Sequence, residues 1–133
     1  MADAGFAEAV PLAGLLGMEI ASAEPEEVRG ALPWRADLCT SGGILHGGAL
    51  MAFADTLGGV CAFLHLPEGA GTATVESKTN FFRPVGAGTV TGVARPLHVG
   101  RSFIVVQTDL TGEGERRVAQ VTQTQAVITR RAE

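Results

Sequence analysis

The chain has 133 residues, of which 46% are hydrophobic and 18% are charged, and its formal net charge is −4. This length and composition predict one folded domain over residues 1–133, and they argue against a disordered chain and against the large α/β scaffolds that carry most Ser-His-Asp triads. The acidic balance argues against a nucleic-acid partner, because a phosphate backbone needs a basic face.

The first half of the chain predicts helices around one extended segment. A short amphipathic helix is expected over residues 6–16, interrupted or started near Pro11. A strand follows over 18–32, with a turn at residues 24–26, and residues 33–43 are irregular. Residues 44–66 place apolar side chains on every face of a helix, so we expect one long helix that is buried rather than laid on a surface.

The second half of the chain predicts four strands joined by short, glycine-rich turns, over residues 72–82, 89–98, 102–111 and 116–129. One mostly antiparallel sheet curled around the long helix accommodates this order of elements. The sequence therefore predicts a fold of the α+β class.

Asp55 is the most informative residue, because it is the only charged side chain between Asp37 and Glu68 and lies in the most apolar segment. An ionised carboxylate is costly to bury without partners, and the predicted helix offers no basic residue to pair with it. Asp55 is therefore a candidate general base. The alternative is a structural role, as a cap of backbone groups or as the partner of a distant basic residue.

The motif His46-Gly47-Gly48 opens the same predicted helix. The first N–H groups of a helix lack intrahelical acceptors, and glycine lets a carbonyl oxygen approach them closely. The motif is thus a candidate oxyanion site, the alternative being a tight turn with His46 as a helix cap. Nine residues place His46 and Asp55 on opposite faces and ~13 Å apart along the axis, so a site using both would combine helices from two subunits.

Other features narrow the class of protein. Residues 1–13 contain no basic side chain, so we expect no secretory signal. Cys39 and Cys61 form no CxxC pair and have no zinc-type spacing to His, which predicts reduced thiols and a cytoplasmic protein. Asp55 at the centre of an apolar stretch rich in Gly and Ala argues against a membrane span. The sequence contains no GxSxG, GxGxxG, HExxH or phosphate-loop motif.

Residues 43–55 resemble the G-x-x-H-G-G motif, followed by Asp, of PaaI-type hotdog thioesterases, and residues 80–84 and 99–102 resemble two further stretches of that family. The resemblance runs from about residue 15 to residue 128. It implies an antiparallel sheet of five or six strands wrapped around a long central helix. It also implies hydrolysis of acyl-CoA thioesters without a metal or other cofactor, by homodimers with two shared sites that usually pair into tetramers.

The same resemblance implies a role for individual residues. Asp55 would be the base or nucleophile, the Gly47 N–H would polarise the thioester carbonyl, and His46 would hold the loop. Thr74 would orient the attacking water. Thr40 stands where many members carry an Asn or Gln that helps to place the substrate or water. With the shorter Thr side chain, a water molecule takes over this placement or the rate is lower. Contacts with the substrate, including the CoA phosphates, are implied for a further group: Gly48, Arg83, Pro84, Arg101 and Ser102.

Two other functions stay open. One is an acyl-thioester hydratase or dehydratase of the same fold, whose sites pair a His with a carboxylate at a spacing different from that of His46 and Asp55. The other is an acyl-CoA-binding protein without activity, in which a buried Asp beside the acyl group has no evident purpose. The sequence leaves the acyl group open.

Overall fold

A computed structural model describes residues 4–129 of the chain. Two short helices, α1 (Ala4–Ala9) and α2 (Pro11–Leu16), precede the strands β1 (Glu19–Glu24) and β2 (Glu27–Pro33). The 3-10 turn η1 (Ala36–Leu38) leads to the long helix α3 (Gly47–Phe63). Four strands follow, with the turn η2 (Glu113–Glu115) between the last two: β3 (Gly71–Phe81), β4 (Thr89–Val99), β5 (Phe103–Thr111) and β6 (Arg117–Ile128).

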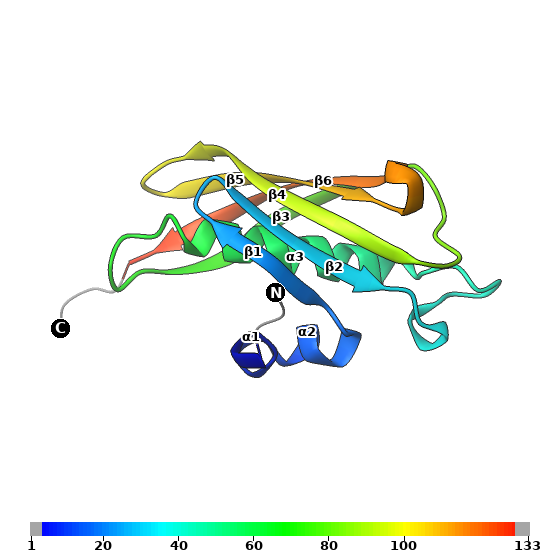
Figure 1. Cartoon of the computed structure of the whole chain (residues 1–133). Coiled ribbons are helices and arrows are strands. Elements are labelled where there is room, and N and C mark those ends of the chain that lie inside the picture. Colours follow the sequence, from blue (N-terminus) through cyan, green and yellow to red (C-terminus); the bar gives the residue numbers. More distant parts are fainter. Residues whose placement is uncertain (1–3, 130–133) are drawn as a thin grey trace.

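All six strands form one antiparallel sheet in the order β1-β2-β4-β5-β6-β3. Figure 1 shows α3 running under this sheet, with α1 and α2 below the N-terminal hairpin. The α+β class and the sheet packed on a long helix are thus confirmed. The single strand expected over residues 18–32 is two strands, β1 and β2, which pair across the predicted turn from Glu24 to Glu27.

The hydrophobic core lies between the sheet and one side of α3. Phe53, Leu57 and Cys61 follow one another at a four-residue spacing, so they share a helix face, and all three are fully buried or nearly so. Gly92 on β4 lets the helix approach closely, because a Cβ at this position would collide with Leu57 Cδ1. Each large apolar side chain buried here contributes roughly 1.5–3 kcal/mol, which anchors α3 to the sheet.

The opposite side of α3 is open. Met51 is 39% exposed and Phe63 is 63% exposed. The expectation of a helix buried on every side is therefore wrong for this chain, because a single sheet covers only one side of a helix. None of the helices within residues 4–129 is long and apolar enough to cross a membrane.

Helix α3 is shorter than expected, because residues 44–46 are not helical. Leu45 forms an isolated antiparallel bridge with Cys39, and His46 is the N-cap, with extended dihedral angles of φ −63° and ψ 135°. At the other end the helix finishes at Phe63 rather than at residue 66. The candidate motif thus lies at the point where the extended chain turns into the helix.

Candidate active site

Asp55 lies half-buried in the middle of α3, where the helix faces two strands. Its Oδ1 accepts a hydrogen bond from Thr74 Oγ1 on β3, at 2.7 Å, and another from Gln123 Nε2 on β6, at 2.9 Å. The four ion pairs within residues 4–129 all join other residues. The carboxylate is therefore held by neutral donors and does not serve as the partner of a basic side chain there.

A cavity of about 600 Å³ opens beside Asp55 and Thr74. Its walls come from α1, from the open side of α3 and from the start of β3, and they are mainly apolar: Phe6, Ala9, Val10, Val60, Phe63 and Ala73. Gly59, one turn after Asp55, leaves this space open, since nothing lies within 4 Å of the position its Cβ would take. The arrangement places a carboxylate at the edge of an apolar chamber, which suits a substrate with an apolar group next to its reacting carbon.

The start of α3 presents a free donor. His46 Nδ1 accepts the N–H of Gly48 at 2.7 Å, so the side chain caps the helix. Within the part of the chain that the structure describes, the N–H of Gly47 has no acceptor. An unpaired N–H at the positive end of a helix is suited to binding a carbonyl oxygen that gains negative charge.

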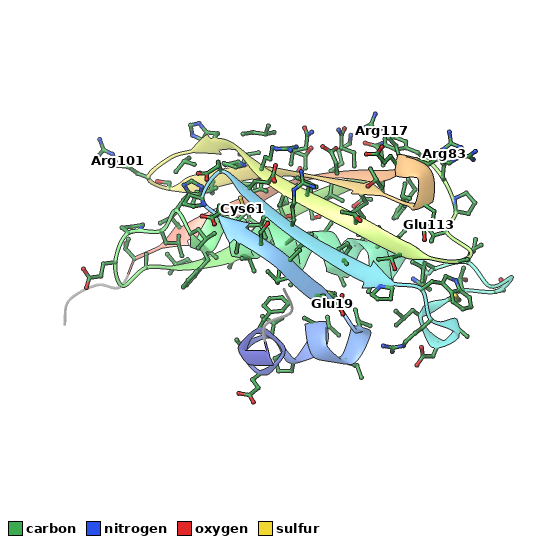
Figure 2. The ribbon with its side chains drawn as sticks, viewed as in Figure 1. Glu19, Cys61, Arg83, Arg101, Glu113 and Arg117 are labelled. Atoms are coloured by element: carbon green, nitrogen blue, oxygen red, sulfur yellow. The ribbon has the colours of Figure 1, made fainter. Side chains whose placement is uncertain are left out.

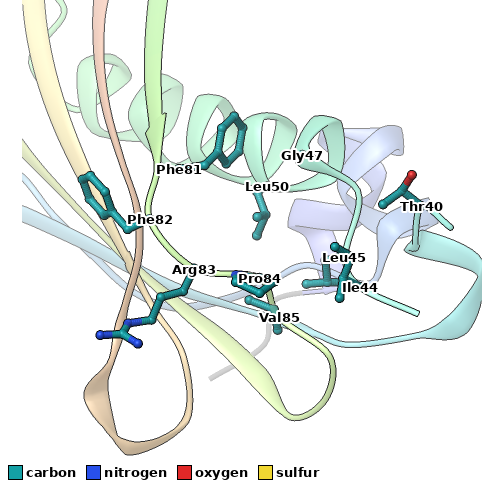
Figure 3. Close-up of a pocket in the computed structure, with 10 residues that line it drawn as sticks. All are labelled: Thr40, Ile44, Leu45, Gly47, Leu50, Phe81, Phe82, Arg83, Pro84 and Val85. Carbon is teal, nitrogen blue, oxygen red and sulfur yellow. The ribbon is translucent and has the colours of Figure 1, made fainter. Parts of the chain in front are cut away.

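Gly47 lines a second cavity, of about 340 Å³. Thr40, Phe81, Arg83 and Pro84 also line this space (Figure 3). In Figure 3 the Arg83 guanidinium points away from Thr40 and the helix start. Of the sequence-predicted residues, Thr40, Gly47, Arg83 and Pro84 thus line one cavity.

The remaining sequence-predicted residues lie elsewhere. His46 and Gly48 face a different hollow, next to Leu12 and Leu16 of α2. Arg101 and Ser102 lie in the turn between β4 and β5, and Figure 2 shows Arg101 at the opposite end of the sheet from Arg83. Within one chain the predicted residues therefore form separate groups.

Asp55 and Gly47 themselves line different cavities. They are eight positions apart on α3, which corresponds to about 12 Å along the helix axis. Both groups could act on one carbonyl only if a second subunit supplied one of them.

Two site residues were missed by sequence reasoning, Gln123 and Gln125 on β6. They are 0% and 1% exposed, and Gln125 Nε2 donates to Thr74 Oγ1 at 2.6 Å. A signal was present, because residues two apart share a face of a strand and Val121, Gln123 and Gln125 therefore point the same way. Two amides in an inward-facing row indicate a polar site in the core, since buried polar groups need partners.

Cys61, on the same helix as Asp55, does not offer a nucleophile. Cys61 is fully buried on the core side of α3, and burial raises the pKa of its thiol to about 11. A thiol with this pKa is protonated at neutral pH and unreactive. No group of three or more His, Cys, Asp or Glu side chains suited to a metal ion occurs among the residues between 4 and 129.

The family model, the relative and the two solved structures that follow are all described as thioesterases. Residues 42–119 match the family model described as the thioesterase superfamily. The proofreading thioesterase EntH of Klebsiella pneumoniae is 46% identical over 59 residues, which cover 44% of this chain and 43% of that protein. A crystal structure of a thioesterase from Haemophilus influenzae superposes with a TM-score of 0.85 at 30% identity, covering 89% of this chain and 82% of the other. A mutant thioesterase from Pseudomonas aeruginosa gives 0.87 at 26% identity, covering 93% and 90%.

Proposed function

The chain belongs to the thioesterase superfamily, and on this basis we propose that it hydrolyses acyl-CoA thioesters to the free acid and CoA. The observation that carries the proposal is the Asp55 carboxylate, held by Thr74 and Gln123 at the edge of the apolar cavity. The proposal includes the PaaI-type subgroup, by the motif at residues 43–55, and a cytoplasmic location.

In the proposed reaction Asp55 removes a proton from a water molecule, whose oxygen attacks the thioester carbonyl carbon. The Gly47 N–H donates to the carbonyl oxygen as it becomes negative. The C–S bond then breaks, the sulfur leaves as a thiol after taking up the proton, and the free acid remains. Direct attack by Asp55, followed by hydrolysis of the mixed anhydride, uses the same groups and gives the same products.

The proposal requires a homodimer, because Gly47 and Asp55 of one chain line different cavities. Two features support a second copy. β3 is an edge strand of 11 residues with one side unpaired, and the open side of α3 exposes Met51 and Phe63. Antiparallel packing of two α3 helices would bring each Gly47 to the other subunit's Asp55. Association of two such dimers into a tetramer is part of the same proposal.

The cavity beside Asp55 also supports a class of acyl group. Its walls are mainly apolar and its volume is about 600 Å³, which suits an aromatic or medium-chain acyl group better than a short, hydroxylated one.

The test is a hydrolysis screen over a panel of acyl-CoAs, with the released thiol measured by a chromogenic disulfide. We expect release with aryl and medium-chain substrates and slower release with short, hydroxylated ones. No thiol release from any member of the panel would overturn the proposal. Hydration of an enoyl-CoA without thiol release would instead identify a hydratase.

Arg83 and Arg101 are proposed to bind the CoA phosphates, each contributed by a different subunit. Replacing either by Ala should raise KM about tenfold with kcat little changed, since a charge-assisted hydrogen bond of ~1.5 kcal/mol is lost from ground state and transition state alike. The effect should shrink with added salt and vanish for a pantetheine thioester, which lacks the nucleotide.

Arg29→Ala is the matched control for these two variants. It removes the same charge, but Arg29 pairs with Glu27, which keeps Arg95 as a second partner. Its KM should equal that of the wild type. Equal loss with the pantetheine substrate would show that Arg83 and Arg101 serve folding or assembly.

A further inference from the structure

We propose that Gln123 is a positioning residue for Asp55, and that its buried amide, together with Thr74, leaves Asp55 Oδ2 as the oxygen that reacts. The inference rests on the proposed hydrolase function and adds to it which atom of the carboxylate takes the proton and what holds that atom in place.

The two oxygens of the Asp55 carboxylate differ in their surroundings. Oδ1 accepts from both Thr74 Oγ1 and Gln123 Nε2. Oδ2 receives no hydrogen bond from any residue between 4 and 129. Two donors occupy Oδ1 and fix the plane of the group, so the unpaired oxygen is the one available to a water molecule or to the substrate carbon.

The Gln123 side chain is enclosed in the protein interior next to Asp55. It is fully buried, and its Nε2 reaches both Oδ1 and, at 3.5 Å, the backbone carbonyl of Asp55. Its Oε1 finds no donor within the described residues. Reversing the amide would turn Oε1 toward the carboxylate, so Asp55 itself determines the orientation. A buried amide with an unpaired oxygen lowers the stability of the fold. Its presence is therefore better explained by its hydrogen bond to Asp55 than by a structural role.

Gly58 makes this contact possible. The Gln123 amide lies against the helix backbone so closely that a Cβ at position 58 would collide with Oε1, Cδ and Nε2. Any side chain at this position would push the amide away from Asp55, which is only three residues earlier on the helix.

Gln125 extends the same arrangement to Thr74. Gln125 Nε2 donates to Thr74 Oγ1, and Gln125 Oε1 accepts from Thr72 Oγ1 at 3.1 Å. Since Thr74 Oγ1 accepts from Gln125, its own proton points to Asp55 Oδ1. Thr74 therefore uses its one hydroxyl proton to bind the carboxylate, and toward the attacking water it can only be a hydrogen-bond acceptor.

The test is Gln123→Met, which keeps the length and apolar stem of the side chain but removes the donor. We expect kcat to fall about 10- to 100-fold with KM changed less than about threefold, because a misplacement of ~1 Å at a reacting group can cost about 100-fold. On an Asp55→Asn background the same substitution should have no further effect on kcat. Gly58→Ala, which displaces the amide without deleting it, should reproduce the loss.

Gln120→Met is the matched control, since Gln120 is the same residue type on the opposite face of β6 and donates to Asp109 instead. It should keep the wild-type kcat. A folded Gln123→Met protein with wild-type kcat would overturn the inference while leaving the proposed function intact. Equal fold losses of kcat on the wild-type and Asp55→Asn backgrounds would show a general structural effect and would overturn it as well.

Thermal unfolding separates this inference from the proposed function, because it needs no activity. The Tm shift caused by Gln123→Met should differ between the wild-type and Asp55→Asn backgrounds, since in the second the partner of the amide has lost its charge. If the wild type releases thiol from no acyl-CoA, the proposed function fails, but the contact between Gln123 and Asp55 can still be tested. If the Tm shifts of Gln123→Met and Asp55→Asn simply add in the double variant, the two side chains do not interact, and the inference is overturned.

Discussion

Asp55→Asn is expected to lower kcat by roughly 10²–10⁴, the usual contribution of a positioned general base. The substitution should leave the local structure intact, because the amide oxygen of Asn can still accept from Thr74 and Gln123. Stability should hold or rise, since a partly buried charge is removed. The measurement is kcat for the best substrate of the panel, together with thermal unfolding of both proteins.

Asp109→Asn is the control for this variant. Asp109 also accepts from two glutamine side chains, Gln107 and Gln120, but it lies on β5 away from the cavity beside Asp55. Its turnover should match the wild type. A folded Asp55→Asn protein with near-normal turnover would show that another group acts as the base or nucleophile.

Gly47→Pro should lower kcat by roughly 10²–10³, the usual cost of losing one oxyanion donor. Proline is favoured at the first position of a helix, and the preceding His46 already has the extended conformation that proline requires. The new Cβ would lie 3.1 Å from Phe81 Cζ, and Phe81 is 51% exposed, so a small displacement of its ring can accommodate the contact. Gly47→Ala is the matched control, because it adds the same Cβ but keeps the N–H.

Mixing the two inactive variants tests whether the site is shared between subunits. In a mixed dimer of Asp55→Asn and Gly47→Pro chains, one site carries both defects and the other carries neither. Random pairing of equal amounts makes about half of the dimers mixed, so activity should recover to roughly a quarter of the wild type. If both variants fold and exchange subunits but the mixture stays inactive, Gly47 and Asp55 act within one chain.

The class of fold could be predicted from the sequence alone, and the sequence alone also nominated Asp55 and His46-Gly47-Gly48 as site candidates. The apolar run around Asp55, the strand-forming segments and the turns are local patterns, and local patterns report secondary structure directly. His46-Gly47-Gly48 was recognisable as the start of a helix for the same reason, since helix capping depends on neighbours within one turn. The helix length was overestimated because Ile44 and Leu45 continue the apolar run but precede the helix in the structure.

Tertiary structure alone decided which residues meet at the carboxylate. Gln123 and Gln125 are 68 and 70 positions after Asp55 in the chain, and only the pairing of β6 with β3 and its packing against α3 bring them to the site. The sequence also did not predict that one side of α3 is open. Apolar composition predicts that a helix face is covered, but not whether the same chain covers it. Contacts between distant segments depend on strand register and on helix packing, and neither is written in a local pattern of residues.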